Sequence, residues 1–139
     1  KLLGATVIAA GRSDDKLAIV HAHGADHVVN IRAADGVAGV RRFRDDVKAL
    51  TGGKGVDVVY DAVGGETSLE AMRSMAFGGR LLIVEYDTHK PVPQWVPYPL
   101  SFQSLRRLFE KAGYGTVQKL GERPSVYGRA RMYAAIIST

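Results

Sequence analysis

The sequence has no cysteine, no long apolar run and no block of charge of one sign. The absence of cysteine excludes a disulfide framework, a thiolate zinc site and a cysteine nucleophile. No apolar stretch approaches the ~20 residues of a membrane-spanning helix, and no signal-peptide pattern is present, so we expect a cytoplasmic protein without a membrane partner. The formal charge is +5, but the basic residues are dispersed and no aromatic residues interleave with them. This pattern favours a solvated surface over a nucleic-acid interface.

Two kinds of functional motif are also missing. The glycine pattern G-x-G-x-x-G, whose backbone amides hold a pyrophosphate at a helix N-terminus, does not occur. The run 52–55 (GGKG) does not replace it, because it precedes an expected strand instead of opening a helix. His21 and His23 lie two apart on an expected helix, where they point in different directions, and the other histidines are scattered. We therefore predict no metal site and no catalytic residue.

The sequence does contain a regular alternation of short apolar runs and amphipathic stretches. Runs rich in Val, Ile and Ala predict strands, and apolar residues spaced three and four apart predict helices. The expected strands are 5–10, 27–30, 56–61, 78–84, 116–120 and 132–137, and the expected helices are 13–23, 37–50, 66–77 and 101–113. Residues 87–99 hold most of the prolines and are predicted to form an ordered loop.

This alternation is typical of an α/β fold, with a mostly parallel sheet in three layers and right-handed crossovers. The last two expected strands have no helix between them, so they must pair antiparallel. A chain of 139 residues is expected to form a single domain, residues 1–139.

Four blocks in the first part of the chain resemble one protein family. The blocks are 2–9 (LLGATVIA), 23–30 (HGADHVVN), 53–65 (GKGVDVVYDAVGG) and 78–84 (GGRLLIV). Residues 1–84 thereby resemble the NADP-binding Rossmann domain of the zinc-independent quinone oxidoreductases, a branch of the medium-chain dehydrogenase/reductase superfamily. The resemblance implies that the chain begins after the strand and glycine loop that open such a domain.

The last part of the chain resembles a different family. Residues 78–87 (GGRLLIVEYD), a Pro-rich loop, the 101–113 helix and a closing hairpin through 131–135 (RMYAA) are similar to the C-terminal part of class I SAM-dependent methyltransferases. Both families use the 78–84 strand. The two resemblances together imply an engineered chimera, with an oxidoreductase-like half at 1–84 and a methyltransferase-like half at 85–139.

The absence of the opening strand has a consequence for the sheet. A Rossmann sheet of order 3-2-1-4-5 that loses its central strand must close the gap or leave bare edges. Closing the gap pairs the first and third strands of this chain and predicts the flavodoxin-like order 2-1-3-4-6-5. The alternative is a homodimer or a strand-exchanged dimer that fills the gap.

The first resemblance also implies two groups of cofactor-binding residues. One group follows the strand whose end meets the adenosine ribose, and its basic residues would suit the 2′-phosphate of NADP. The other group forms the turn near the nicotinamide ribose. The two groups are Gly11, Arg12, Ser13 and Lys16, and then Asp61, Val63 and Gly64. Without the resemblance, the same residues are explained as a basic turn with a helix cap and as a strand-to-helix turn.

Glu85 and Asp87 end the fourth expected strand at the same edge of the sheet. Paired carboxylates there could act as acid and base, although a solvated strand end explains them more simply.

The leading functional hypothesis is a hybrid Rossmann-like scaffold without native catalysis and without a cofactor, because the main anchor of both cofactor classes is missing. The first alternative is an NADPH-dependent, quinone-oxidoreductase-like domain, whose glycine loop and substrate domain a partner chain would supply. The second alternative is a remnant of a SAM-dependent methyltransferase that binds SAM.

Overall fold

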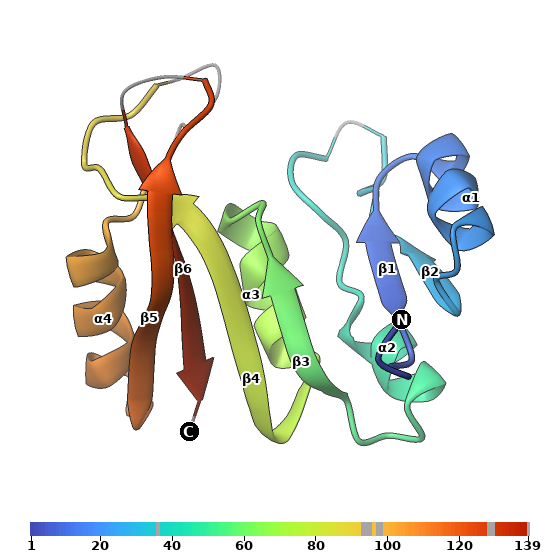
Figure 1. The fold of residues 1–139 in the computed structure, drawn as a ribbon. Coiled ribbons are helices and arrows are strands. Elements are labelled where there is room, and N and C mark those ends of the chain that lie inside the picture. The colour runs from blue at the N-terminus through green and yellow to red at the C-terminus, as the bar shows by residue number, and fades with distance from the viewer. Residues whose placement is uncertain (36, 93–95, 97–98, 128–129, 139) are drawn as a thin grey trace.

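The computed structural model of the protein describes residues 1–35, 37–92, 96, 99–127 and 130–138. Figure 1 shows strands and helices alternating along most of the chain, and the fold is mixed α/β. The elements are β1 (Ile8–Gly11), α1 (Asp14–Ala22), β2 (His27–Asn30), α2 (Arg44–Leu50), β3 (Val56–Asp61), α3 (Gly65–Arg73), β4 (Met75–Tyr86), α4 (Phe102–Lys111), β5 (Thr116–Pro124) and β6 (Arg131–Ser138). The order of elements predicted from the sequence is confirmed. The predicted 87–99 loop falls partly outside the described residues.

The described strands form two sheets. β1 and β2 pair in parallel as a small sheet, and a larger sheet has the order β3-β4-β6-β5. β4 runs parallel to β3 and antiparallel to β6, which makes the stretch 78–84 part of an interior strand. β5 and β6 pair antiparallel, as the missing helix between them requires.

The predicted pairing of the first strand with the third is wrong for the described strands. β1 pairs with β2 alone and β3 pairs on one side with β4, so each has an edge without a strand partner. Figure 1 shows β1 and β3 pointing the same way on either side of the interval between the sheets. The two sheets are joined instead by side-chain packing: α2 packs against both β2 and α3, and Val56 of β3 packs against the buried cluster that contains Phe43 and Val47.

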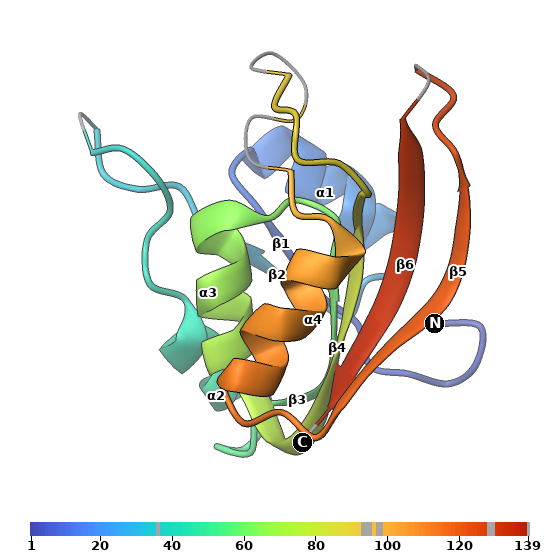
Figure 2. The same cartoon turned by 90° about the vertical axis from the view of Figure 1, so that its left-hand side faces the viewer.

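The main core lies between the larger sheet and its helices. Figure 2 shows α3 and α4 side by side on one face of this sheet. The strands turn buried side chains toward them, and the cluster consists of Val59, Leu81, Leu105, Phe109, Tyr133, Ala135 and Ile137. On the opposite face Val58 and Tyr60 are 54% and 65% exposed, and no helix of the described chain covers them. The predicted three-layer arrangement is therefore not seen for this sheet.

A smaller core joins the two sheets. Val29, Ile31, Phe43 and Val47 are buried together, and Val56 of β3 packs against them. The apolar face of α2 thus fills the space at one end of the interval between β1 and β3, which fixes how the first part of the chain sits on the second.

Two predicted helix boundaries are wrong by several residues. The helix expected at 37–50 begins only at Arg44, because Val40 forms an isolated bridge with Arg32 instead. The helix expected at 66–77 ends at Arg73, because Met75 already pairs with Val56. Gly55 permits that early pairing: it has φ +87°, and a Cβ at this position would lie 2.6 Å from the carbonyl oxygen of Ser74.

Candidate functional site

The turn after β1 holds four of the predicted residues. Ser13 is the N-cap of α1, and its Oγ accepts a hydrogen bond from the backbone N–H of Lys16 at 3.4 Å. Gly11 lies against the helix, where a Cβ would come 3.1 Å from Leu17 Cδ2. Arg12 and Lys16 are exposed, and no carboxylate within the described chain forms an ion pair with either. The turn combines a capped helix start with two cations that face solvent.

A further basic residue lies at this edge, and sequence reasoning missed it. Arg32 follows β2, and its Nε donates a hydrogen bond to the carbonyl oxygen of Arg12 at 3.2 Å. Asn30 connects the same two turns: its Oδ1 accepts from Arg32 N at 2.8 Å, and its Nδ2 donates to Asp14 Oδ1 at 2.6 Å. The sequence did show a basic residue directly after the second strand. That residue points to the turn after β1 only once β2 is known to lie parallel beside β1.

The turn after β3 is organised by one buried carboxylate. Asp61 is 6% exposed, and its Oδ1 accepts hydrogen bonds from Val63 N at 2.9 Å and Gly64 N at 3.1 Å. Its Oδ2 accepts a hydrogen bond from the hydroxyl of Ser68 on α3. Gly64 has φ +80°, a conformation that favours glycine. Asp61 therefore shapes the turn, and Val63, which is 74% exposed, stands at its tip.

Glu85 at the end of β4 faces the same turn. A Cβ at Gly64 would lie 4.0 Å from Glu85 Oε2. Burial raises the pKa of Glu85, the hydrogen bond from Tyr86 N at 2.6 Å opposes the rise, and the negative charge of Asp61 adds to it. The structure thus brings Asp61, Gly64 and Glu85 together at the carboxyl ends of β3 and β4.

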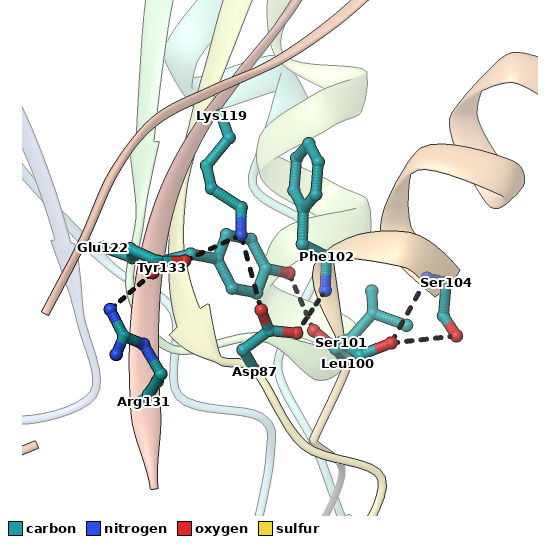
Figure 3. A network of polar contacts seen from close by, with 9 residues as sticks. All are labelled: Asp87, Leu100, Ser101, Phe102, Ser104, Lys119, Glu122, Arg131 and Tyr133. Carbon is teal, nitrogen blue, oxygen red and sulfur yellow. Dashed lines mark hydrogen bonds and ion pairs between the residues drawn. The ribbon is translucent and has the colours of Figure 1, made fainter. Parts of the chain in front are cut away.

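Asp87 serves the packing of α4 and does not form the acid–base pair considered for it and Glu85. Figure 3 shows its carboxylate turned toward the start of the helix, where Oδ1 accepts from Phe102 N at 3.0 Å. Its Oδ2 lies 3.5 Å from Lys119 Nζ, which also lies 3.0 Å from Glu122 Oε2. These contacts tie the end of β4 to α4 and β5, so the carboxylate of Asp87 is occupied.

The phenol of Tyr133 lies behind this network (Figure 3). Its hydroxyl donates a hydrogen bond to the carbonyl oxygen of Leu100 at 2.7 Å. Burial raises the pKa of Tyr133 far above its ordinary value, and the negative charges of Glu85 and Asp87 add to the rise. The phenol therefore stays protonated and supports the loop before α4.

The predicted residues fall into two separate groups. Gly11, Arg12, Ser13 and Lys16 lie at the carboxyl end of β1, and the turn that contains Asp61, Val63 and Gly64 lies at the carboxyl end of β3. Figure 1 shows both ends on the same side of the molecule, on different sheets. In open α/β sheets this is the side on which ligands bind.

A shallow hollow of about 370 Å³ lies elsewhere, on the uncovered face of the larger sheet. Tyr60, Val84, Met132 and Ala134 contribute to its lining, and none of the predicted cofactor residues does. In the described parts of the chain no helix is long and apolar enough to cross a membrane.

Comparison with known proteins decides the family. A family model described as "Zinc-binding dehydrogenase" matches residues 1–117. The chain belongs to the zinc-binding dehydrogenase family. Quinone oxidoreductase-like protein 2 of Bos taurus is 39% identical over 85 residues, which are 61% of this chain and 22% of that protein. Sorbitol dehydrogenase of Bacillus subtilis is 31% identical over 100 residues, 70% of this chain and 26% of that protein. The chain therefore spans about a fifth to a quarter of these relatives.

Solved structures of similar chains agree with this family. An NAD-dependent alcohol dehydrogenase is 39% identical, with a TM-score of 0.52 over 59% of this chain and 22% of its own length. A mycobacterial protein, Rv1454c, whose structure holds NADPH, is 28% identical, with a TM-score of 0.51 over 76% of this chain and 29% of its own length. The likeness supports the Rossmann-type character of the fold.

The predicted chimera receives no support. The family match continues through 78–84 to residue 117 and so crosses the strand at which the two halves were expected to join. A precorrin methyltransferase domain of Corynebacterium diphtheriae aligns at 14% identity with a TM-score of 0.49, which is too low to carry an argument.

The zinc in the family's description does not fit the residues present here. Zinc sites in proteins use Cys, His, Asp and Glu side chains grouped around one point. The sequence has no cysteine, and no group of three or more such side chains occurs among the described residues.

Proposed function

We propose that the chain is the cofactor-binding part of an NADP(H)-dependent, quinone-oxidoreductase-like reductase. In such an enzyme the cofactor passes a hydride to a small electrophilic substrate, and the protein supplies binding and orientation. The adenosine end of the cofactor lies at the turn after β1, and the nicotinamide ribose lies at the turn after β3.

One observation carries this proposal. The family match covers both strand ends at which the predicted residues lie, and a similar chain of 28% identity holds NADPH in its structure. The family match also bears on the interval between β1 and β3. In the doubly wound order 3-2-1-4-5, the strand that carries the glycine loop lies at this position, and its loop would reach the pyrophosphate between the two groups of residues.

The choice of NADP over NAD rests on this chain's own residues, since a similar solved chain is an NAD-dependent alcohol dehydrogenase. An NAD enzyme places an acidic residue at the end of the second strand of the doubly wound sheet, where it accepts hydrogen bonds from the ribose hydroxyls. The corresponding end here is β1, which finishes at Gly11 and is followed by Arg12. A guanidinium suits a phosphate, which carries charge and several acceptor oxygens.

The leading hypothesis from the sequence, a scaffold without a cofactor, is not supported by the comparisons. The absence of the glycine pattern removes one anchor from the chain, and the two turns to which we assign the ribose contacts keep their local hydrogen bonds.

Calorimetric titration of the chain with NADPH tests the proposal. We expect saturable binding that is weakened about tenfold or more by Arg12→Glu, because the variant replaces a phosphate ligand with a like charge. Arg107→Glu on the exposed face of α4 is the matched control and should bind as the unsubstituted chain does. Saturable binding of SAM without binding of NADPH would contradict the proposal.

A further inference from the structure

The side chain of Arg32 crosses from one strand end to the next. Arg32 belongs to the segment after β2, yet its Nε donates to the carbonyl oxygen of Arg12 in the turn after β1 at 3.2 Å. Its own backbone N–H is held by Asn30 Oδ1 at 2.8 Å. The guanidinium therefore lies beside the turn that carries Arg12, although 20 residues separate the two in the sequence.

The contact with Arg12 uses only part of the hydrogen-bonding capacity of Arg32. A guanidinium has five N–H donors in a planar fork, and the carbonyl of Arg12 takes the one on Nε. The two Nη groups can face a ligand, and their geometry matches two oxygens of a phosphate. The Nε contact limits the motion of the side chain, so less conformational entropy is lost when a ligand binds.

The charges around Arg32 favour an anion. Arg41, which also contacts the segment after β2, is neutralised by Asp46 at 2.6 Å. Arg32 and Arg12 form no ion pair with a carboxylate of the described chain. The carboxylate of Asp14, at the start of α1, accepts a hydrogen bond from Asn30 Nδ2 at 2.6 Å. The Asn30 amide is neutral, so Asp14 keeps its negative charge, but Asp14 forms no ion pair with Arg12 or Arg32. The guanidinium of Arg32 and the backbone of Arg12 meet at one turn, which places two arginines at this strand end.

We propose that Arg32 is the second guanidinium ligand, beside Arg12, for the 2′-phosphate of NADP(H). This inference rests on the function proposed above and deepens it by naming a residue that sets the preference for a phosphorylated adenosine ribose. Arg32 contacts the phosphate with its Nη groups, while its Nε holds the turn that presents Arg12.

The test uses two small probes that differ in the 2′-phosphate alone, adenosine 2′,5′-bisphosphate and 5′-AMP. The ratio of their dissociation constants measures recognition of that phosphate. We expect the bisphosphate to bind more tightly than 5′-AMP, and Arg32→Ala to reduce the ratio about tenfold, as the loss of charged hydrogen bonds predicts. Arg32→Gln retains an N–H donor for the carbonyl of Arg12, and it should reduce the ratio by a similar factor. Arg107→Ala, exposed on α4, should leave it unchanged.

Each outcome bears on one claim. An unchanged ratio in both Arg32 variants would overturn the role of Arg32 and leave the proposed function standing. An equal loss of affinity for both probes would mean that Arg32 only shapes the turn, which also overturns the inference. If the unsubstituted chain binds neither probe nor NADPH, the proposed function itself is overturned. Thermal unfolding followed by circular dichroism verifies that each variant is folded.

Discussion

At the scale of single residues, the site depends on carboxylates that hold backbone in place. Asp61 accepts hydrogen bonds from Val63 N, Gly64 N and Ser68 Oγ while it is almost completely buried. Removing the carboxylate leaves three donors without a partner inside the protein. We expect Asp61→Ala to lower the free energy of unfolding by about 1–3 kcal/mol, measured by urea denaturation.

Asp57 provides the matched control for this substitution. It lies on the same strand, is exposed, and has no hydrogen-bond partner among the described side chains. Asp57→Ala should change the free energy of unfolding by less than about 0.5 kcal/mol. If the two variants are equally stable, Asp61 does not organise the turn after β3.

At the site, hydrogen bonds between residues close in the sequence were more predictable than those between distant residues. The sequence pointed to Asp61, Gly64 and Ser13 as turn and cap residues, and the structure confirms these local hydrogen bonds. It did not point to Arg32 or Asn30, because their contacts with Arg12 and Asp14 span 20 and 16 residues. Such contacts depend on which strands become neighbours.

At the scale of elements, Glu70 ties α3 to the start of α2. Its Oε1 lies 2.5 Å from Arg73 Nη1, and its Oε2 accepts a hydrogen bond from Phe43 N at 3.4 Å. Burial raises the pKa of Glu70, but the hydrogen bonds from Arg73 and Phe43 and the charges of Arg73 and Arg42 outweigh it, so the pKa lies below its usual value. The ionised form is therefore the one that stabilises the folded state.

The lowered pKa of Glu70 predicts how the free energy of unfolding depends on pH. A carboxyl whose pKa is lowered by folding stabilises the protein above its unfolded-state pKa of about 4.3, and that stability is lost as the pH falls through the folded-state pKa. We expect Glu70→Gln to be less stable than the unsubstituted chain at pH 7, and the difference to shrink as the pH falls below about 4. Urea denaturation at several pH values measures it, with Glu66→Gln, exposed on the same helix, as the control. A difference that stays constant with pH would contradict this role.

The helix and strand boundaries show where local patterns stop being informative. The spacing of Leu69, Met72 and Met75 suits a helix, yet Met75 lies in β4 because it pairs with Val56. Val40 has a helical spacing to Phe43 and Val47, yet it forms a bridge with Arg32. In both places backbone pairing with another segment outweighs the local preference for helix.

At the scale of the whole molecule, the most unusual feature is the pair of unpaired strand edges, on β1 and β3, that border the interval between the two sheets. β1 and β3 each expose backbone N–H and C=O groups along one edge, and such edges pair readily with other chains. The homodimer considered from the sequence remains our proposal for the isolated chain. We expect its apparent mass, measured by light scattering after size exclusion, to rise with concentration.

A charge on the edge strand tests this association. Val58 on β3 is 54% exposed, and Val58→Lys should shift the equilibrium toward the monomer, since lysine on an edge strand opposes pairing. Val126→Lys, at a residue 75% exposed in the connection between β5 and β6, should have no effect. A chain that is monomeric at all concentrations, or a dimer that Val58→Lys does not weaken, would contradict association through these edges.

The arrangement of the whole sheet was the least predictable level. The sequence correctly predicted which strands are neighbours within each sheet, because right-handed parallel connections and an antiparallel hairpin leave few choices. The expected closure between β1 and β3 is wrong, because side-chain packing around α2 joins the two sheets and backbone pairing does not. The expectation of a single domain remains a prediction.

The central claim is that NADP(H) lies across the carboxyl ends of β1 and β3. Titration of the isotope-labelled chain with NADPH, followed by NMR amide shifts, tests it most directly. The account predicts saturable shifts at residues 11–16 and 61–65, on the two strand ends that Figure 1 shows on one side of the molecule. Shifts confined to the uncovered face around Tyr60 and Met132, or no shifts at all, would contradict it.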